Sequence, residues 1–480
     1  MTPVGVRLQR AFTPDDQKWF AALSGDCNPM HMDPIAARRT PAGEPAVHGV
    51  HTLLWALETI AALHPDLAVP SALRVDFASF LVVGRTATLG ELKGEGNRRA
   101  TVFADGLAIM TVELRFGSMA AALDTNGVPS DAPLPDAPDT AVVLNLKDIA
   151  AQAGAVAFAS APGMVQDAFP RASAWLGRSR VGALMASTRL VGMVCPGLHS
   201  IFNRIDVNLH EFAGDADQLR YAVAGVDPRF RRVKLSVSGG GIAGTLVTSV
   251  RNPPVRQSDI AALAGIIDPN SFRGSRALVI GGSRGLGELT AKILAAGGAD
   301  VVITYARGQA DAERVAQEVI EWGGTCRAIS YDAHADARAQ LGDQAGRITH
   351  CYYYATSPIF VPSASIFEKA RFDRFNAIYV NGFFALCDAL GAGTERRIGI
   401  FYPSSVAVED RPPGMSEYAM AKAAGELLCD EINRRQKAIR VIMSRLPRLA
   451  TDQTATLFAE EAVSTLDVIL PLVRQVQAVA

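Results

Sequence analysis

The sequence predicts two kinds of fold in one chain: an α+β N-terminal half, and an α/β C-terminal domain with a doubly wound parallel sheet. Residues 1–123 and 141–255 each have an apolar helical stretch followed by several strand-like runs. From residue 272 to residue 480, apolar strands alternate with helical stretches. A segment rich in Pro, Asp and Gly, residues 124–140, reads as the linker between the first two pieces.

Length and charge exclude several classes of function. The 480 residues carry 47 basic and 48 acidic side chains, so there is no basic excess to bind a nucleic-acid backbone. No run of about 18 apolar residues is present to span a bilayer, and the start lacks the apolar core of an export signal. We therefore expect a cytoplasmic protein with neither a membrane span nor a nucleic-acid partner.

The first two pieces repeat one order of elements. Apolar residues recur at helical spacing within residues 47–63 and again within residues 181–194. One helix against an antiparallel sheet, made twice, suggests a duplicated unit. The expected strands are 73–77, 86–92, 100–104 and 108–116 in the first piece, and 201–209, 218–224, 232–238 and 243–250 in the second.

The third piece alternates strands with helices, which predicts a parallel sheet covered on both faces. Its first strand runs directly into the loop GGSRGLG and then into a helix. Glycines in such a loop permit a tight turn and let a pyrophosphate approach the helix N-terminus. The expected strands are 277–282, 300–306, 326–332, 349–355, 397–405 and 440–446, and a last helical stretch covers 464–477.

A tyrosine and a lysine one helical turn apart give the second signal in this piece. Tyr418 and Lys422 stand at positions i and i+4, so both side chains can reach one cleft. A nearby ammonium lowers the pKa of a phenol, and such a phenol can act as general acid toward a carbonyl. Ser405, at the end of a predicted strand, can hold the substrate oxygen beside it.

Together, the glycine loop, Ser405, Tyr418 and Lys422 resemble the short-chain dehydrogenase/reductase family, over about residues 274–455. The resemblance implies a Rossmann-type fold and hydride transfer between a nicotinamide and a carbonyl or alcohol. It assigns catalytic roles to these three residues and to Asn381, with Tyr418 and Lys422 also contacting the cofactor. The expected cofactor contacts in the loop are Gly281, Ser283, Arg284, Gly285, Leu286 and Gly287.

The residues after the second and third strands indicate which cofactor binds. An acid after the second strand would bind a free ribose hydroxyl, but Arg307 follows here. With Arg284 in the loop, two arginines suit a 2′-phosphate, so we expect NADPH. The alternative is that both arginines are solvated surface residues. Asp332, after the third strand, matches the adenine-contacting aspartate of the family.

Three departures from the family pattern stand out. The family's Asn-Asn-Ala-Gly motif is Tyr-Tyr-Ala-Thr here, ending at Thr356, and its Pro-Gly is Pro447-Arg448. No final strand is evident beyond the last helical stretch. We expect altered geometry near Thr356, and a homo-oligomer, with a dimer favoured over the family's usual tetramer.

The N-terminal piece carries a separate polar motif. Asp26 and His31 are five residues apart, and an Asn-Pro pair forces a turn between them. A carboxylate and an imidazole can together exchange a proton at carbon and move water on or off the adjacent carbon. Gly49 opens the apolar helix, where its amide can polarise a thioester carbonyl. The alternative is that Asp26 makes turn hydrogen bonds and His31 is a buried polar residue.

The string GDCNPMHMD, residues 25–33, and the His-Gly pair downstream resemble the (R)-specific enoyl-CoA hydratase and MaoC-like dehydratase family of hot-dog folds. The resemblance gives Asp26 and His31 the catalytic roles and Gly49 the oxyanion contact. The second piece lacks the string, so we expect it to complete a double hot-dog without chemistry of its own. We interpret His48 and His51 as helix packing and expect no metal site.

Both motif sets in one chain predict two consecutive reactions. The first is NADPH-dependent reduction of a 3-oxoacyl thioester, and the second is dehydration of the (3R)-alcohol to a trans-2-enoyl thioester, in fatty-acid or polyketide-like biosynthesis. The substrate partner would be an acyl-CoA or an acyl-carrier-protein thioester. Two alternatives stay open: hydration followed by NAD-linked oxidation in acyl degradation, or a hot-dog half that only binds an acyl-carrier protein.

Overall fold

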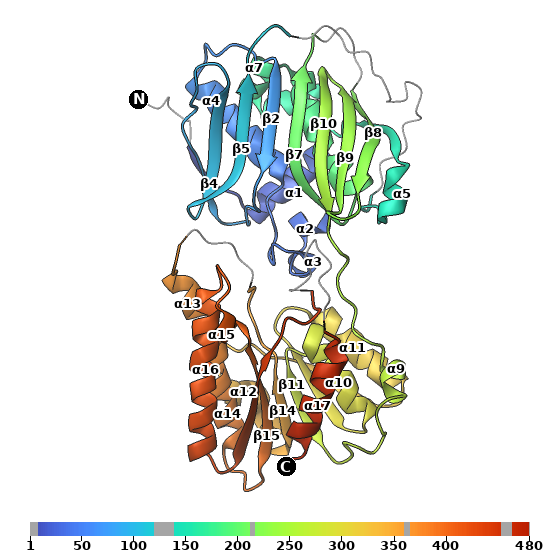
Figure 1. Cartoon of the computed structure of the whole chain (residues 1–480), viewed down its shortest axis with the longest axis vertical. Helices are drawn as coiled ribbons and strands as arrows, with labels where there is room; N and C mark the ends of the chain where they lie inside the picture. The colour runs from blue at the N-terminus through green and yellow to red at the C-terminus, as the bar shows by residue number, and fades with distance from the viewer. Residues whose placement is uncertain (1–7, 120–138, 212–216, 360–364, 453–462, 480) are drawn as a thin grey trace. The chain divides into compact units, whose positions relative to one another are not determined.

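The computed structural model describes residues 8–119, 139–211, 217–359, 365–452 and 463–479, so most of the predicted linker 124–140 lies outside the described residues. The chain folds into two compact units that divide between Pro253 and Pro254 (Figure 1). The first unit contains the α+β half, and the second contains the α/β part.

One ten-stranded sheet forms the first unit, in the order β1-β3-β4-β5-β2-β7-β10-β9-β8-β6. Its two halves join where β2 pairs antiparallel with β7, from Ala72 opposite Asn208 to Asp76 opposite Arg204. This continuous sheet confirms the predicted double hot-dog. The strands are β1 (Gln9–Ala11), β2 (Ala72–Phe77), β3 (Thr86–Leu89), β4 (Arg98–Ala104), β5 (Leu107–Arg115), β6 (Ala153–Ala157), β7 (Ser200–Leu209), β8 (Gln218–Asp227), β9 (Arg232–Gly239) and β10 (Ile242–Val250).

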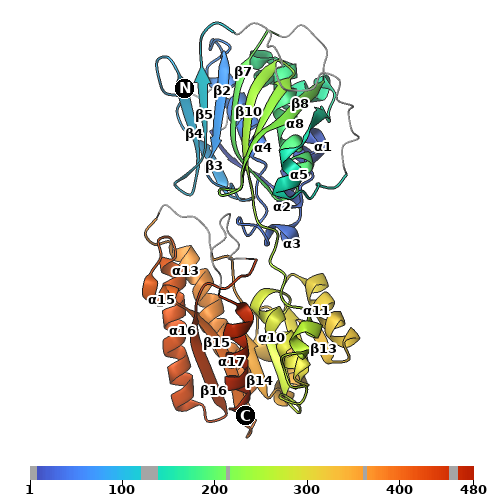
Figure 2. The same ribbon diagram turned by 45° about the vertical axis from the view of Figure 1, so that its right-hand side comes forward.

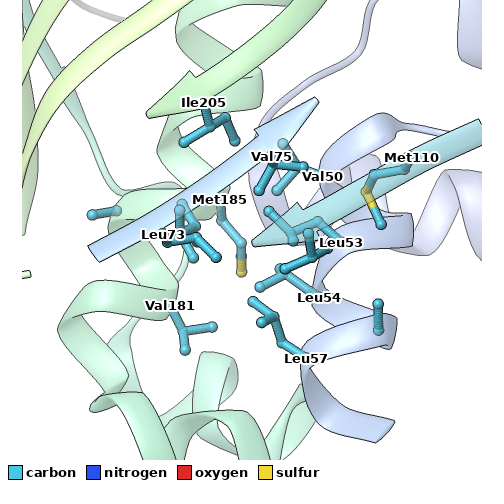
Figure 3. Packing of buried hydrophobic residues seen from close by; sticks show 14 of the residues in the cluster. Val50, Leu53, Leu54, Leu57, Leu73, Val75, Met110, Val181, Met185 and Ile205 are labelled. Carbon is cyan, nitrogen blue, oxygen red and sulfur yellow. The ribbon is translucent and has the colours of Figure 1, made fainter. Parts of the chain in front are cut away.

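Two long helices, α4 (Gly49–Leu63) and α8 (Arg178–Arg189), lie on the same face of this sheet (Figure 2). Figure 3 shows Met185 of α8 among Leu54 of α4 and Leu73 of β2, and all three side chains are buried. Apolar burial of this kind contributes about 2 kcal/mol per side chain. The two halves therefore share one hydrophobic core.

The smaller elements of this unit are where sequence reading was least complete. It did not predict β1 and β6, which have 3 and 5 residues and little alternation. It also missed α1, although Thr13 forms a capping box with Asp16 at its start. The predicted helix 181–194 is α-helical up to Arg189, the end of α8, and then continues as a π-helix. There, Cys195 N–H donates to the Leu190 carbonyl. The shorter helices are α1 (Pro14–Ser24), α2 (Pro29–Met32), α3 (Pro34–Ala37), α5 (Leu146–Ala150), α6 (Pro162–Ala168), α7 (Pro170–Leu176) and the π-helix (Leu190–Val194).

A six-stranded parallel sheet forms the second unit, in the order β13-β12-β11-β14-β15-β16. This is the Rossmann-type order, in which the chain reverses direction between β11 and β14 and leaves a crevice at the carboxyl ends of the strands. The prediction of an α/β doubly wound fold is thus confirmed. The strands are β11 (Arg276–Ile280), β12 (Asp300–Tyr305), β13 (Thr325–Ser330), β14 (His350–Tyr353), β15 (Ile398–Ser405) and β16 (Ile439–Leu446).

Helices cover both faces of this sheet, in two separate clusters of buried apolar side chains. One face carries α9 (Ile260–Ala264), α10 (Gly285–Ala296), α11 (Gln309–Glu321) and α17 (Thr465–Gln477). The other carries α12 (Ala337–Leu341), α13 (Lys369–Asn376), a π-helix (Ala377–Gly382), α14 (Phe383–Gly391) and α16 (Ser416–Arg435). A 3-10 helix (Gly342–Arg347) and α15 (Ala407–Asp410) complete the unit. Among the described residues, no helix is both long and apolar enough to cross a membrane.

The seam between the halves of the first unit carries a network of charges. Arg74 Nε donates to the carboxylate of Asp76 at 3.0 Å, and Arg204 from the other half donates to the same carboxylate. Arg115 and Asp206 form a second pair across the seam. Burial alone would raise the pKa of Asp76, but the two arginine hydrogen bonds outweigh it and hold that pKa below its usual value.

We expect Asp76→Asn to lower the free energy of unfolding at pH 7 by about 0.5–1 kcal/mol, because the pairs are partly exposed and screened by water. A lowered carboxyl pKa stabilises the folded state above the unfolded pKa, and this contribution is lost as the pH falls through the folded pKa. Thermal unfolding of the wild type and of Asp76→Asn measures this: the stability difference between the two proteins should be smaller at acid pH than at pH 7. A difference that grows in acid would contradict the network.

Candidate active sites

The first site begins at the turn between α1 and α2. The helix α1 ends on Gly25, which has a φ of 75°, and Asn28 caps α2 by accepting from Met30 N–H at 3.2 Å. This local geometry places Asp26 in the turn and His31 on the next helix. The Asn-Pro turn that the sequence predicted is therefore present.

Asp26 is buried, with 1% of its surface exposed, and both carboxylate oxygens accept hydrogen bonds. Asn28 N–H donates to Oδ1 at 3.2 Å, and the Thr188 hydroxyl donates to Oδ2 at 2.7 Å. Burial raises the pKa of Asp26, against the opposing effects of His31, Thr188 and Asn28. A carboxyl group with a raised pKa is better able to carry and release a proton.

His31 has one ring nitrogen committed to the fold. Its Nδ1 lies 2.7 Å from the carbonyl oxygen of Ala46, and because a carbonyl only accepts, Nδ1 carries the proton. The lone pair of the neutral ring is therefore on Nε2. Burial lowers the pKa of His31, with the charge of Asp26 acting in the opposite direction, so the neutral ring is favoured. A neutral imidazole with an available Nε2 can accept a proton.

The second half of the sheet builds one wall of this site. Thr188 comes from α8, and Asn28 Nδ2 donates to the Gly192 carbonyl in the π-helix at 2.9 Å. A Cβ at Gly192 would lie only 2.4 Å from Oδ1 of Asp26. Sequence reading found neither Thr188 nor Gly192, because they lie more than 160 positions from Asp26 and belong to no local motif.

The two histidines that we interpreted as helix packing differ in their surroundings. His51 packs among aromatic rings and stacks on Phe20 at 4.5 Å, as that interpretation requires. His48 instead places its ring nitrogens 3.0 Å from Gln17 Oε1 and 3.0 Å from the Asp26 carbonyl, and it stacks on His31 at 3.9 Å. His48 therefore contacts both residues of the candidate pair, Asp26 and His31, in addition to packing at the start of the helix.

The donor atoms of Asp26, His31 and His48 lie within 4.8 Å of one another, a separation that a metal ion could bridge. Protein oxygens already face both ring nitrogens of His48 and Nδ1 of His31. This arrangement fits a proton-transfer site. Gly49 is the first residue of α4, where backbone N–H groups have no partner within the helix, so its amide remains the candidate oxyanion contact.

The second site is built on the loop between β11 and α10. Gly281 and Gly285 have φ values of 78° and 57°, in the region that favours glycine. A Cβ at Gly287 would lie 2.2 Å from the Gly281 carbonyl oxygen, so only glycine lets the helix start against the loop. Thr304 on β12 fixes the loop by accepting from Gly281 N–H at 3.1 Å. This cradle at the N-terminus of α10 fits the pyrophosphate of a dinucleotide.

Three predicted residues meet on β15 and α16. Tyr418 is buried and is hydrogen-bonded to the Ser405 side chain; burial raises the pKa of Tyr418 and that bond opposes the shift. Lys422 Nζ donates to the Pro403 carbonyl at 2.6 Å, and burial lowers its pKa to about 7. The prediction that the ammonium lowers the phenol pKa is therefore wrong: burial raises this pKa, and the opposing effect comes from Ser405.

The remaining predicted residues have other surroundings, and the contacts that hold Tyr418 and Lys422 do not involve them. Asn381 lies in the π-helix and is exposed, and Ser283 is buried in the glycine loop. Arg284 Nη1 lies 3.2 Å from Asp452 Oδ2, so its guanidinium is already in an ion pair. Leu286 is half-buried at the start of α10, and Arg307 and Asp332 are exposed after β12 and β13.

Comparison with known families finds matches for both parts of the chain. A family model described as short chain dehydrogenase matches residues 275–462, and one described as MaoC like domain matches residues 1–105. The short-chain dehydrogenase/reductase homolog YusS of Bacillus subtilis is 35% identical over 101 residues, which are 21% of this chain and 89% of that protein.

Two further relatives match shorter parts of their own length. The 3-hydroxyacyl-thioester dehydratase X of Mycobacterium tuberculosis is 34% identical over 105 residues, 22% of this chain and 36% of that protein. The 3-oxoacyl-[acyl-carrier-protein] reductase of Synechocystis sp. is 46% identical over 66 residues, 14% of this chain and 27% of that protein. The chain thus covers less than half the length of each of these two relatives.

Gly192→Ala should destabilise the first unit by about 1–3 kcal/mol, because the added methyl overlaps the carboxylate of Asp26. Urea unfolding of the variant measures this loss. Gly225→Ala in β8 is the matched control, since a Cβ there meets nothing within 4 Å. Equal stability of the two variants would contradict this prediction, because it would show that the residues around Asp26 move enough to accommodate the added methyl.

Proposed function

The chain belongs to the short-chain dehydrogenase/reductase family through its C-terminal unit and carries a MaoC-like domain at its N-terminal end, and on this premise we propose that it catalyses two consecutive steps of acyl-thioester metabolism. The first is reduction of a 3-oxoacyl thioester to the (3R)-hydroxyacyl form. The second is dehydration to the trans-2-enoyl thioester. The observation that carries the proposal is that both polar constellations occur complete in one chain: Asp26 with His31, and Ser405 with Tyr418 and Lys422.

In dehydration, the α proton and the 3-hydroxyl leave together as water. Nε2 of His31 takes the proton from the α carbon, and the carboxyl group of Asp26 gives a proton to the departing hydroxyl. The Gly49 amide, at the N-terminal end of α4, stabilises the charge that develops on the thioester oxygen. A proton exchanged between Asp26 and His31 restores the starting state.

In reduction, a nicotinamide bound in the glycine-loop cradle would supply the hydride. Ser405 holds the substrate carbonyl oxygen, and Tyr418 donates its phenolic proton to that oxygen. Lys422 keeps a positive charge near the phenol and offers donors to the cofactor ribose. The cradle formed by Gly281, Gly285 and Gly287 would hold the pyrophosphate.

NADPH is the form of the cofactor that we propose. Two features support it: β12 is not followed by an acid, and the exposed Arg307 comes shortly after that strand, where its guanidinium could contact a 2′-phosphate. Arg284 contributes less directly, because Asp452 already pairs with it. Asp332, whose pKa is lowered by hydrogen bonds from His334, is the proposed adenine contact.

The direction, the acyl carrier and the assembly are parts of the same proposal. We expect acyl groups carried on CoA or on a carrier protein, and synthesis rather than degradation, because NADPH normally serves reduction. We expect a homodimer. Apolar side chains on α16 such as Met420 and Leu427, which are 49% and 72% exposed, support a contact between subunits on this helix.

The two activities should separate by mutation. Tyr418→Phe is expected to lower NADPH oxidation with a 3-oxoacyl thioester by about 10²–10⁴-fold while leaving dehydration of a 3-hydroxyacyl thioester unchanged. Asp26→Asn and His31→Ala should produce the opposite pattern. Mass spectrometry of the thioester products, on CoA and on carrier protein, follows both steps. Dehydration that survives Asp26→Asn would remove the assignment of the first site.

Cofactor preference should depend on Arg307. Arg307→Ala is expected to raise KM for NADPH by about 10–100-fold, because a charge-assisted contact to phosphate is lost, and to change KM for NADH little. Steady-state kinetics with both cofactors tests this, with Arg314→Ala on α11 as a control for general loss of positive charge. Equal effects on the two cofactors would contradict a 2′-phosphate contact.

A further inference from the structure

The ammonium of Lys422 lies inside a group of tyrosine rings. Its Nζ is 3.8 Å from the ring centroid of Tyr379, 5.0 Å from that of Tyr402 and 5.9 Å from that of Tyr418. Aromatic ring faces attract a cation by their quadrupole, most strongly where water is excluded. Among the three, Tyr379 makes the shortest contact, so its ring contributes most to holding the ammonium in place.

Tyr379 also contacts the catalytic phenol and the altered loop after β14. Its ring packs edge-on against Tyr418, with centroids 5.7 Å apart and an interplanar angle of 80°. Its hydroxyl lies 2.6 Å from the Thr356 hydroxyl, and Thr356 donates its own proton to the Ser357 carbonyl at 3.0 Å. Since Thr356 has a single hydroxyl proton, Tyr379 is the donor to Thr356.

We propose that Tyr379 is a positioning residue of the reductase, which holds Lys422 by its ring and is itself oriented by the Thr356 hydroxyl. This inference rests on the proposed reductase function of the second unit. It explains a departure that the sequence showed, because Thr356 stands where the family has glycine. A glycine there would leave the buried Tyr379 hydroxyl without this partner, at a cost in stability.

The ring of Tyr379 acts on the reductase through the charge state of Lys422. Burial lowers the pKa of Lys422 to about 7, while the ring faces and the Pro403 carbonyl favour the ammonium. Removing the Tyr379 ring takes away part of that support and so lowers the pKa further. The titratable groups that face Lys422 are Glu426, Cys429 and Tyr418 on α16, Tyr379 on the π-helix and Tyr402 on β15.

Reduction uses protonated Lys422, so kcat/KM for reduction should fall as the pH rises through the pKa of this lysine. Tyr379→Leu should move that limb to lower pH by about 1 pH unit and lower kcat by about tenfold, whereas KM for the thioester changes little. Tyr379→Phe keeps the ring but loses the contact with the Thr356 hydroxyl, so its limb should move less than that of Tyr379→Leu. Thr356→Val, which releases the Tyr379 hydroxyl, should lower kcat less than Tyr379→Leu does.

The experiment records pH profiles of acetoacetyl-thioester reduction by NADPH, together with NMR titration of ¹³Cε-labelled lysine, in the full chain. Lys422→Met identifies the Lys422 signal. The matched control is Tyr353→Phe. It removes another buried hydroxyl, which donates to the Ile378 carbonyl at 2.7 Å. Circular dichroism and NADPH fluorescence check that each variant folds and binds cofactor.

A lower Lys422 pKa in Tyr379→Leu, with Tyr353→Phe like the wild type, supports the proposal. An unchanged Lys422 titration and pH profile in Tyr379→Leu overturns it, as does an equal shift in Tyr353→Phe. If Tyr379→Leu does not fold, wild-type kinetics in Thr356→Val overturn it instead. A wild-type protein that does not reduce the thioester contradicts the proposed function, while the NMR titration still decides whether the ring supports the ammonium.

Discussion

The antiparallel pairing of β2 with β7 is the interaction on which the first unit depends. It turns two five-stranded halves into one sheet, so neither half has an unpaired central edge. The same pairing brings α4 and α8 onto one face, where their apolar side chains fill a common core. It also carries Thr188 and the π-helix to the turn that holds Asp26. The pairing of β2 with β7 therefore also shapes the candidate site, because the second half donates a hydrogen bond to a buried carboxylate that the first half supplies.

Local signals explain why so much could be predicted. The string GDCNPMHMD and the glycine loop are contiguous, and Tyr418 and Lys422 are separated by one helical turn, so the resemblance to two known families could be recognised from the sequence. Alternating strands and apolar helices likewise gave both fold classes, because periodicity follows directly from backbone geometry. Contacts between distant segments left no such signal. Thr188 and Gly192 became recognisable only when the sheet brought them beside Asp26, and His48 looked like packing because a helix start gives no sign of what its ring faces.

The second unit shows how a family motif is replaced without losing the fold. Tyr353 fills the position of a family asparagine, and its hydroxyl reaches the Ile378 carbonyl in the π-helix, while Tyr402 reaches the Tyr379 carbonyl at 3.1 Å. Large buried phenols thus donate hydrogen bonds to two carbonyls of an irregular helix. The departure from the motif was visible in the sequence, but its compensation was not, since the interacting residues lie on three separate elements.

The close approach of Gly192 to Asp26 has a consequence for how related chains are judged. The candidate site is divided between the two halves of the first unit: the first half contains the recognisable string, and the second half leaves the space that the Asp26 carboxylate occupies. A homologue with an intact string and a bulky side chain at the position of Gly192 would have no room for the carboxylate in its present orientation. An assignment of the same function to a homologue therefore has to consider both halves, because the half without a motif also limits the space around the carboxylate.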